Sequence, residues 1–260
     1  MLSTSSISYH VGHKQILSNV SADFQPGEFN MILGPNGSGK STFLKIFSGD
    51  LDPNEGEVNY GGRSLRSISK PQLATRRAVM SQHSELNFPL AVDEVILMGR
   101  YPHFNFIPTK KDMAICDEVM KRMDLHALKE RNYLTLSGGE KQRVQFARVL
   151  AQIWESPAEG QRYLMLDEPL SSLDINYQHE FLRLAEEFIH NNTVLVAIIH
   201  DINLAIQYAD KLFFLKEGRL VAEGKPSTVV TAALIETVFG IKASIVPNPI
   251  SAEPLVLFEK

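Results

Sequence analysis

The sequence FNMILGPNGSGKSTFLKIFSG, residues 29–49, joins three local patterns that together indicate the fold class. Residues 29–33 form a short apolar run, which predicts a buried strand. Residues 41–49 place apolar side chains at helical spacing, and Gly49 is a helix stop signal. Between them, residues 34–42 match the pattern G-x-x-x-x-G-K-[ST] of a phosphate loop, between a strand and a helix. The stretch therefore predicts a nucleotide site in an α/β protein.

The residue types in this loop suit the chemistry of holding a polyphosphate. Its glycines let the backbone turn N–H groups toward phosphate oxygens. Lys40 would neutralise the outer phosphates, and the Ser41 hydroxyl would ligate Mg²⁺. The alternative is a glycine-rich turn that only caps a helix, but a chance match in this length is on the order of 1%. We expect nucleotide contacts from Gly34, Pro35, Asn36, Gly37, Ser38, Gly39, Lys40, Ser41 and Thr42.

Two carboxylates follow a second apolar run, RYLMLDEP at residues 162–169. In doubly wound sheets, ligands bind at the carboxyl ends of the strands. Asp167 suits Mg²⁺, held through water, and Glu168 suits a general base that orients the attacking water. Taken alone, the pair could equally be a solvated acidic turn. Together with a phosphate loop, the pair indicates hydrolysis.

Three further residues are candidates for the same site. His200 ends the apolar run at residues 193–199 and could contact the γ-phosphate and hold the water. Gln82 follows the run at residues 76–81, and its amide could reach Mg²⁺ or the water. Tyr9 could stack on adenine, although a core tyrosine is a close alternative.

The segment LTLSGGEKQRVQFARVLAQ, residues 134–152, predicts an amphipathic helix with an unusual start. Ser137 and Glu140 have the spacing of a capping box, which marks the helix N-terminus. Gly138 and Gly139 lie between them, and each glycine costs about 1 kcal/mol relative to alanine. A serine and two glycines at a helix N-terminus indicate a second anion-binding site.

Apolar runs and helical segments alternate along the chain, which predicts a parallel sheet with crossover helices. Residues 210–225 predict a hairpin that turns at Glu217 and Gly218. Short β-rich runs predict further strands at residues 76–81, 162–166 and 193–199.

Residues 91–152 differ, because helical patterns replace strands. One helical face carries side chains that we interpret as core filling: Met113, Cys116, Met120 and Met123. We expect a single domain with a nucleotide-binding core, a helical subdomain and a short tail, at residues 1–90 with 153–240, 91–152 and 241–260 respectively.

Composition narrows the class of protein. The chain has 260 residues, 44% of them hydrophobic, and a net charge of −4 that favours no nucleic-acid partner. A single cysteine allows no internal disulfide and fits a reducing compartment. The N-terminus lacks the pattern of a signal peptide, and no apolar run approaches the roughly 20 residues of a membrane span. We therefore expect a protein that does not cross a bilayer by itself.

The motifs together resemble the ATP-binding cassette family, and they occur in that family's order: the phosphate loop, Gln82, LSGGE, LMLDEP, SSLD and His200. The resemblance implies a P-loop NTPase core with a mainly parallel sheet, an N-terminal antiparallel β part and an inserted helical subdomain. It also implies ATP and Mg²⁺ as ligands, and head-to-tail pairing with a second copy. Asp174 would link the two sites across that dimer. The residues implied to contact the partner copy's ATP are Ser137, Gly138, Gly139 and Glu140.

A finer resemblance is to ATPases of iron-chelate, cobalamin and haem importers, carried by VILMGRYPH at residues 95–103 and by residues 138–152. IWESPAEGQR at residues 153–162 and the segment 174–188 look most like haem importer ATPases. The resemblance implies a permease dimer as partner, indirectly a substrate-binding protein, and a peripheral location on the cytoplasmic face of the inner membrane. Leu170 departs from the family, which more often has threonine there, but this removes no phosphate or metal ligand.

Other functions are consistent with parts of the sequence. The cargo could be an iron-siderophore or cobalamin, and an iron–sulphur cluster assembly ATPase would have the same length. A nucleotide-binding protein without hydrolysis is a further alternative, against which Glu168 and His200 argue. We interpret five histidines as surface or interface residues, not haem ligands: His10, His13, His83, His103 and His179.

Overall fold

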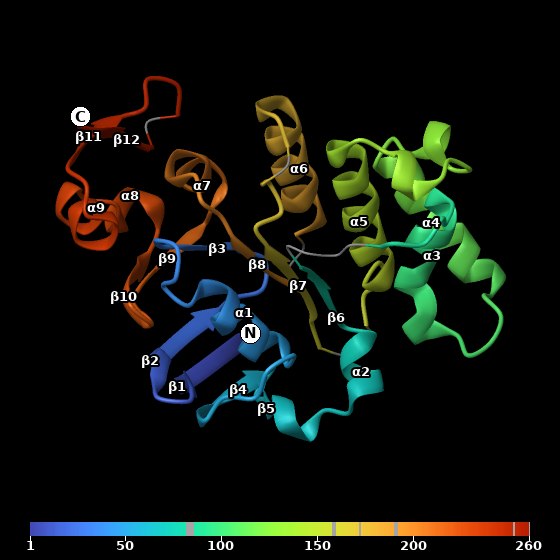
Figure 1. Cartoon of the computed structure of the whole chain (residues 1–260), viewed down its shortest axis with the longest axis horizontal. Coiled ribbons are helices and arrows are strands. Elements are labelled where there is room, and N and C mark those ends of the chain that lie inside the picture. Colours follow the sequence, from blue (N-terminus) through green and yellow to red (C-terminus); the bar gives the residue numbers. More distant parts are fainter. Residues whose placement is uncertain (82–85, 158–159, 172, 190–191, 252, 260) are drawn as a thin grey trace. The chain divides into compact units, whose positions relative to one another are not determined.

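The computed structural model describes residues 1–81, 86–157, 160–171, 173–189, 192–251 and 253–259. The chain forms two compact units, the first made of residues 1–67 and 189–260 and the second of residues 68–188. Figure 1 labels the helices and strands of both units.

The first unit contains most of the strands. Its elements are β1 (Leu2–Val11), β2 (Lys14–Phe24), β3 (Phe29–Leu33), α1 (Lys40–Ser48), β4 (Glu55–Tyr60), β5 (Arg63–Ser64), η1 (Leu65–Ser67), β8 (Thr193–Ile198), α7 (Ile202–Tyr208), β9 (Lys211–Lys216), β10 (Arg219–Gly224), α8 (Pro226–Val229), α9 (Ala232–Phe239), β11 (Ala243–Pro247) and β12 (Pro254–Phe258). Strands β2, β1, β4 and β5 form an antiparallel sheet in that order. β3 pairs in parallel with β8 on one side and β9 on the other, and β10 adds antiparallel to β9.

The apolar run at residues 29–33 forms the inner strand β3, and all five of its residues are buried. Strands that are covered on both faces need a continuous apolar run, which explains why this run does not alternate. Phe24 of β2 joins α1 to β9, because its ring centre lies 5.3 Å from that of Phe47 on α1 and 4.7 Å from that of Phe213 on β9. The loop that joins β3 to α1 is thus held between two rigid elements.

The predicted hairpin is confirmed as β9 and β10. Its turn residues, Glu217 and Gly218, have positive φ angles of 48° and 72°, as in the two-residue turns that suit twisted hairpins. The Gly218 N–H donates to the Ser38 carbonyl (3.0 Å), and the Ser18 N–H donates to the Gly218 carbonyl (2.8 Å). Hydrogen bonds from this turn therefore hold the loop at residues 34–39 in place.

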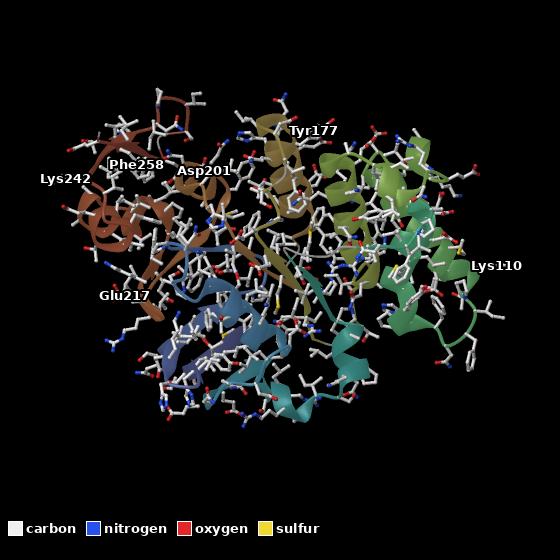
Figure 2. The ribbon with its side chains drawn as sticks, in the orientation of Figure 1. Lys110, Tyr177, Asp201, Glu217, Lys242 and Phe258 are labelled. Atoms are coloured by element: carbon white, nitrogen blue, oxygen red, sulfur yellow. The ribbon has the colours of Figure 1, made fainter. Side chains whose placement is uncertain are left out.

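The C-terminal segment forms an antiparallel pair, β11 with β12, that is fastened to α7. Asn203 of α7 donates to the Val256 carbonyl (3.1 Å) and accepts from the Val256 N–H (2.8 Å). Figure 2 labels Asp201, which caps α7 by accepting the Leu204 N–H at 3.0 Å, and Phe258 near the chain end.

The second unit is mainly helical. Its elements are α2 (Lys70–Ala74), β6 (Arg77–Met80), α3 (Val92–Leu97), η2 (Met98–His103), α4 (Lys110–Arg122), η3 (His126–Leu128), η4 (Tyr133–Thr135), α5 (Gly138–Gln152), β7 (Arg162–Asp167) and α6 (Ile175–Phe188). β6 and β7 pair in parallel, as their apolar runs predicted. No strand lies between residues 91 and 152, a range that the structure describes completely.

The sulfur-containing side chains of α4 divide between the core and the surface. Cys116, Met120 and Met123 are buried, and burial raises the pKa of the Cys116 thiol to about 11. The prediction that Met113 also fills the core is wrong, because this side chain is 49% exposed. Met113 shares a helix face with Cys116 and Met120 by spacing, but it lies about one turn before them, near the start of α4.

No helix in the described part of the chain is both long enough and apolar enough to cross a membrane.

Candidate functional site

The loop between β3 and α1 is shaped by its glycines. Gly34 has φ 152°, and a Cβ atom there would lie 2.1 Å from the Leu215 carbonyl oxygen. No other residue type fits so close to a backbone carbonyl. Asn36 and Gly37 form the exposed crest of the loop, and Gly39 caps the start of α1 in the left-handed conformation.

The interior of the loop presents a cation and a hydroxyl. Lys40 is only 5% exposed, and its Nζ donates to the carbonyls of Gly34 (2.9 Å) and Pro35 (3.0 Å). The Ser38 Oγ is buried and has no hydrogen-bond partner among the described residues. Buried polar atoms usually have partners. An anion that accepts from backbone N–H groups, the ammonium and this hydroxyl fits the loop.

His200 lies at the same sheet edge as this loop. β3 and β8 are parallel neighbours with Ile32 opposite Ile198, and the Ile199 N–H donates to the Ile32 carbonyl at 3.2 Å. His200 therefore directly follows β8 where Gly34 follows β3. Its side chain is exposed at this edge.

Tyr9 lies one strand away from the loop. It is on β1 opposite Leu17 of β2, and it is half-buried. A Cβ atom on Gly39 would lie 2.8 Å from the Leu17 Cδ2 and 2.9 Å from the Ile16 carbonyl oxygen. β2 therefore borders the loop directly, and Tyr9 is beside it. Ser41 and Thr42, in the first turn of α1, are half-buried.

In the second unit, β7 ends at the two predicted carboxylates. Asp167 is 5% exposed and Glu168 is half-buried. Glu168 has φ 51°, a left-handed conformation that is costly for a residue with a side chain. Such strain re-aims the side chain at the strand end, and sequence patterns do not predict it.

The start of α5 has the predicted capping box. The Glu140 N–H donates to the Ser137 Oγ (3.3 Å), and the Ser137 N–H donates to the Glu140 carboxylate (2.7 Å). These hydrogen bonds hold the pKa of Glu140 below its usual range. Ser137 and Gly138 are exposed, and a Cβ atom on Gly139 would meet nothing closer than 3.6 Å. The chain's own packing therefore does not require glycine at 139.

A pocket of about 330 Å³ in the second unit brings several of these residues together. It is lined by the end of β6, the carboxylates after β7 and the first turns of α5; its lining includes Ser81, Gly138, Gln142, Gln145, Asp167 and Glu168. Gln142 donates to the Pro169 carbonyl and so ties α5 to the carboxylate segment. The sequence analysis missed Gln142, although it lies one turn after Gly138 and therefore on the same helix face.

Two predicted site residues remain, Gln82 and Asp174. Gln82 lies outside the described residues. Asp174 precedes α6 and caps it, because its Oδ1 accepts from the Tyr177 N–H at 3.1 Å. Tyr177, labelled in Figure 2, carries the Arg143 guanidinium 5.3 Å from its ring centre.

The described residues contain no group of three or more His, Cys, Asp or Glu side chains arranged to hold a metal ion. Mg²⁺ commonly takes few protein ligands and completes its shell with phosphate oxygens and water. The hydroxyl of Ser41 and the carboxylate of Asp167 are oxygen donors of that kind.

Comparison with known proteins gives a consistent result. Residues 17–171 match the protein family described as ABC transporter. The Hemin import ATP-binding protein HmuV of Gloeobacter violaceus is 44% identical over 257 residues, which are 99% of this chain and 94% of the relative. The protein of the same name from Escherichia coli O157:H7 is 40% identical over 260 residues and covers 100% of both chains.

Among solved structures, a dimeric post-hydrolysis state of the ATP-binding cassette MJ0796, bound to ADP and Pi, has the same fold. Its TM-score is 0.73 and its sequence is 26% identical, over 86% of this chain and 98% of that chain.

Proposed function

This chain belongs to the ABC transporter family, and from that premise we propose that it binds and hydrolyses ATP to drive an importer of hemin. The ATP chemistry rests on the loop at residues 34–39. There the Lys40 ammonium is buried, the buried Ser38 hydroxyl has no hydrogen-bond partner in the described part of the chain, and the backbone leaves no room for a side chain at Gly34. Hemin as the cargo is supported by the two relatives named Hemin import ATP-binding protein HmuV, which match nearly the whole chain at 44% and 40% identity.

In this proposal the residues divide the reaction between them. The backbone of the loop and Lys40 hold the phosphates, and Tyr9 stacks on adenine. Glu168 accepts a proton from the attacking water, and His200 orients that water at the γ-phosphate. Mg²⁺ supplies charge neutralisation between the phosphates when bound, and Ser41 and Asp167 are the residues that would hold it.

The start of α5 acts on a second copy of the chain. Two copies pair head to tail, so that Ser137, Gly138 and Gly139 of one copy contact the γ-phosphate held by the other. The pairing is supported by the exposure of Ser137 and Gly138, and by packing around Gly139 that would accommodate a Cβ atom. Asp174 couples the two sites, and Glu140 keeps the helix start in shape. Gln82 stays a predicted ligand of the metal or the water.

The permease contact is assigned to the second unit. Large apolar side chains are exposed between residues 88 and 113: Phe88, Tyr101, Phe106, Ile107 and Met113. Phe106 and Ile107 are adjacent in the chain and are 96% and 79% exposed, and a group of exposed apolar side chains marks a protein interaction site. The chain lies on the cytoplasmic face of the inner membrane, where a pair of integral-membrane permease subunits covers this surface. A substrate-binding protein delivers the cargo to that permease.

The experiment that tests the function is a pull-down of the tagged chain from solubilised membranes of its host, with mass spectrometry of the partners. We expect a multi-span permease, and hemin uptake by vesicles that contain the complex and MgATP. The double variant Phe106→Asp/Ile107→Asp should lose the permease because charge replaces apolar contact, while its own ATP binding is unchanged. Ile250→Asp, at a 95% exposed apolar residue of the first unit, is the matched control and should keep the permease.

Other partners would identify other functions. Recovery of a soluble cluster-assembly scaffold without a permease would overturn transport in favour of iron–sulphur cluster assembly. Uptake of a ferric siderophore or cobalamin in place of hemin would keep transport and overturn the cargo.

A further inference from the structure

The segment η2 lies directly against the last turn of α5. A Cβ atom on Gly99 would lie 2.1 Å from the Arg148 carbonyl oxygen and 3.3 Å from the Ala151 Cβ. Only glycine permits this approach of one backbone to the other. The close contact fixes how η2 and α5 are oriented at this point.

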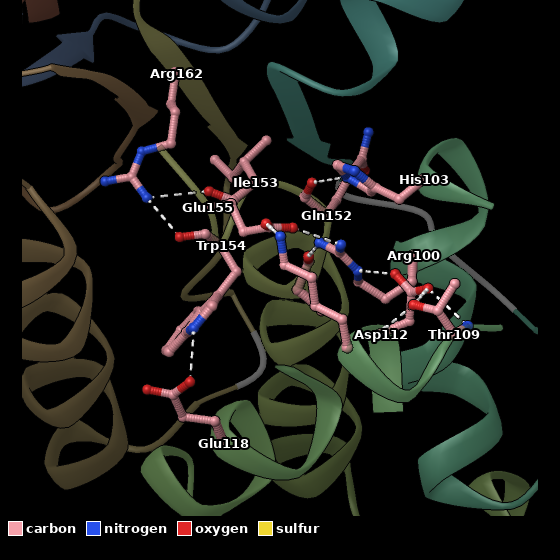
Figure 3. A network of polar contacts seen from close by, with 12 residues as sticks. Arg100, His103, Thr109, Asp112, Glu118, Gln152, Ile153, Trp154, Glu155 and Arg162 are labelled. Carbon is pink, nitrogen blue, oxygen red and sulfur yellow. Dashed lines mark hydrogen bonds and ion pairs between the residues drawn. The ribbon is translucent and has the colours of Figure 1, made fainter. Parts of the chain in front are cut away.

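Arg100 follows Gly99 and closes the contact. Its side chain is 1% exposed. The guanidinium donates to the Ala151 carbonyl at 2.8 Å, and it pairs with Asp112 at 3.0 Å and with Glu155 at 2.7 Å, as Figure 3 shows. Glu155 is also paired with Lys111. Each side of the guanidinium fork therefore has a partner.

Both carboxylate oxygens of Asp112 accept hydrogen bonds in this network, one from Arg100 and the other from Thr109. Burial alone would raise the pKa of Asp112, but hydrogen bonds from the Thr109 hydroxyl (2.6 Å) and N–H (2.9 Å), together with Arg100, outweigh burial and hold the pKa below its usual range. Asp112 also closes the capping box of α4 with Thr109. One carboxylate thus joins the start of α4 to Arg100.

His103, at the end of η2, makes a second contact with the same helix end. Its Nε2 lies 2.7 Å from the Gln152 carbonyl oxygen (Figure 3). The Gln152 side chain donates to the carbonyls of Ala74 (2.8 Å), at the end of α2, and Arg77 (2.9 Å), at the start of β6. The carboxyl end of α5 is therefore fixed to η2 and to β6 at once.

These contacts use groups that a helix end leaves unpaired. The last four carbonyls of a helix have no partner within it, and a cation there is favoured by the helix dipole. Arg100 and His103 take two of them, those of Ala151 and Gln152. A buried ionic network of this kind adds little net stability, because desolvation offsets attraction, but it does specify one geometry. Its effect is on orientation.

We propose that Arg100 and His103 are positioning residues for the start of α5. The inference rests on the proposed function, in which Ser137, Gly138 and Gly139 close on the partner copy's ATP. α5 has 15 residues, so its two ends are about 22 Å apart. A small tilt at the end held by Arg100 therefore displaces the other end more than a hydrogen bond tolerates. The network therefore fixes the orientation of α5 that places its start against the partner copy's ATP.

The middle of α5 is stiff enough to transmit such a tilt. The Phe146 ring packs 4.2 Å from the Phe181 ring of α6, and Val144, Ala147 and Leu150 are buried. Close-packed interiors pass displacement on with little compression. The same η2 segment carries Tyr101, which is 58% exposed, so contact at the proposed permease surface would reach α5 through Arg100.

The test uses the full chain with Glu168→Gln, which slows hydrolysis so that an ATP-bound dimer accumulates. Sedimentation measures the MgATP concentration at half-maximal dimer, and a fluorescent ATP analogue measures affinity for the dilute monomer. His103→Leu removes one hydrogen bond without burying a charge. Arg100→Met is combined with Asp112→Asn, so that no lone carboxylate stays buried. Arg122→Met on α4 is the matched control, because it removes an exposed ion pair with Glu187 of α6.

We expect His103→Leu to raise the half-maximal MgATP concentration about fivefold, the worth of one hydrogen bond, and the Arg100 variant to raise it further. Monomer affinity should not change, and Arg122→Met should match the parent. Arg100→Lys keeps the positive charge but loses the forked guanidinium. Its half-maximal MgATP concentration should lie between those of the parent and the Arg100→Met/Asp112→Asn variant. If the Arg100 variants do not fold, His103→Leu decides.

Equal midpoints in all variants would overturn the positioning role and leave the proposed function intact. A parallel loss of monomer affinity would overturn it as well, because it would indicate general destabilisation. A parent that forms no dimer with MgATP would instead remove the proposed pairing, and the positioning role with it.

Discussion

The positions of Gly34 and Lys40 in the loop between β3 and α1 follow from the sequence pattern. The glycine spacing predicted a backbone wrapped around phosphate, and the structure leaves no room for a side chain at Gly34. The buried Ser38 hydroxyl could not be predicted. Its burial depends on the β9–β10 turn, whose Gly218 lies far along the chain and donates to the Ser38 carbonyl.

The two glycines of the loop should differ in their cost of substitution. Gly34→Ala drives a methyl group against a backbone carbonyl, so we expect a loss of about 2–3 kcal/mol of unfolding free energy. Gly37 has φ 79° but open space around it, so Gly37→Ala should cost about 1 kcal/mol from its left-handed backbone alone. Urea unfolding midpoints measure both. Equal costs would contradict the close approach at Gly34.

At the scale of elements, the strands β3, β6, β7 and β8, the hairpin and the start of α5 follow from local patterns. Each of these elements is predicted by the pattern of a few neighbouring residues, and the structure confirms them. The clamp on the other end of α5, formed by Arg100 and His103, was not predicted from the sequence. Arg100 and the Ala151 carbonyl that it reaches are 51 positions apart. Periodicity within an element does not report which distant carbonyl a buried cation will reach.

Capping and ligand contact can be separated at the start of α5. Ser137→Ala removes a cap and should lower stability by about 1 kcal/mol. Ser69→Ala removes the equivalent hydroxyl of the capping box on α2, with Gln72 in the place of Glu140, and should cost a similar amount. Only Ser137→Ala should also reduce ATP hydrolysis, measured as phosphate release. Equal activity in the two variants would count against contact between Ser137 and nucleotide.

At the scale of the whole molecule, the resemblance to a family predicted the fold class, which the strand pairings of each unit confirm. The division into a core, a helical subdomain at 91–152 and a tail stays a prediction. The compact units have boundaries at residues 67 and 188, and the second unit takes in β6, β7 and α6. Composition changes mark helical segments, but they do not report which strands pack with them.

Hydrogen exchange should separate the two units during nucleotide binding. With the Glu168→Gln chain kept dilute, MgATP should slow exchange in residues 34–48, which hold the phosphates, but not in residues 137–142. At concentrations that favour pairing, residues 137–142 of the second unit should become protected too. Lys40→Ala should abolish both effects. Protection of residues 137–142 in the dilute monomer would show that the second unit responds without a partner copy.

The clamp at the end of α5 also constrains how the gene can change. Inserting or deleting one residue within α5 would rotate its start by about 100° relative to the end held by Arg100 and His103. Ser137, Gly138 and Gly139 would then face away from any bound phosphate, however well the altered helix folded. Length variation among relatives should therefore be absent from residues 138–152 and should gather in the connection that follows them.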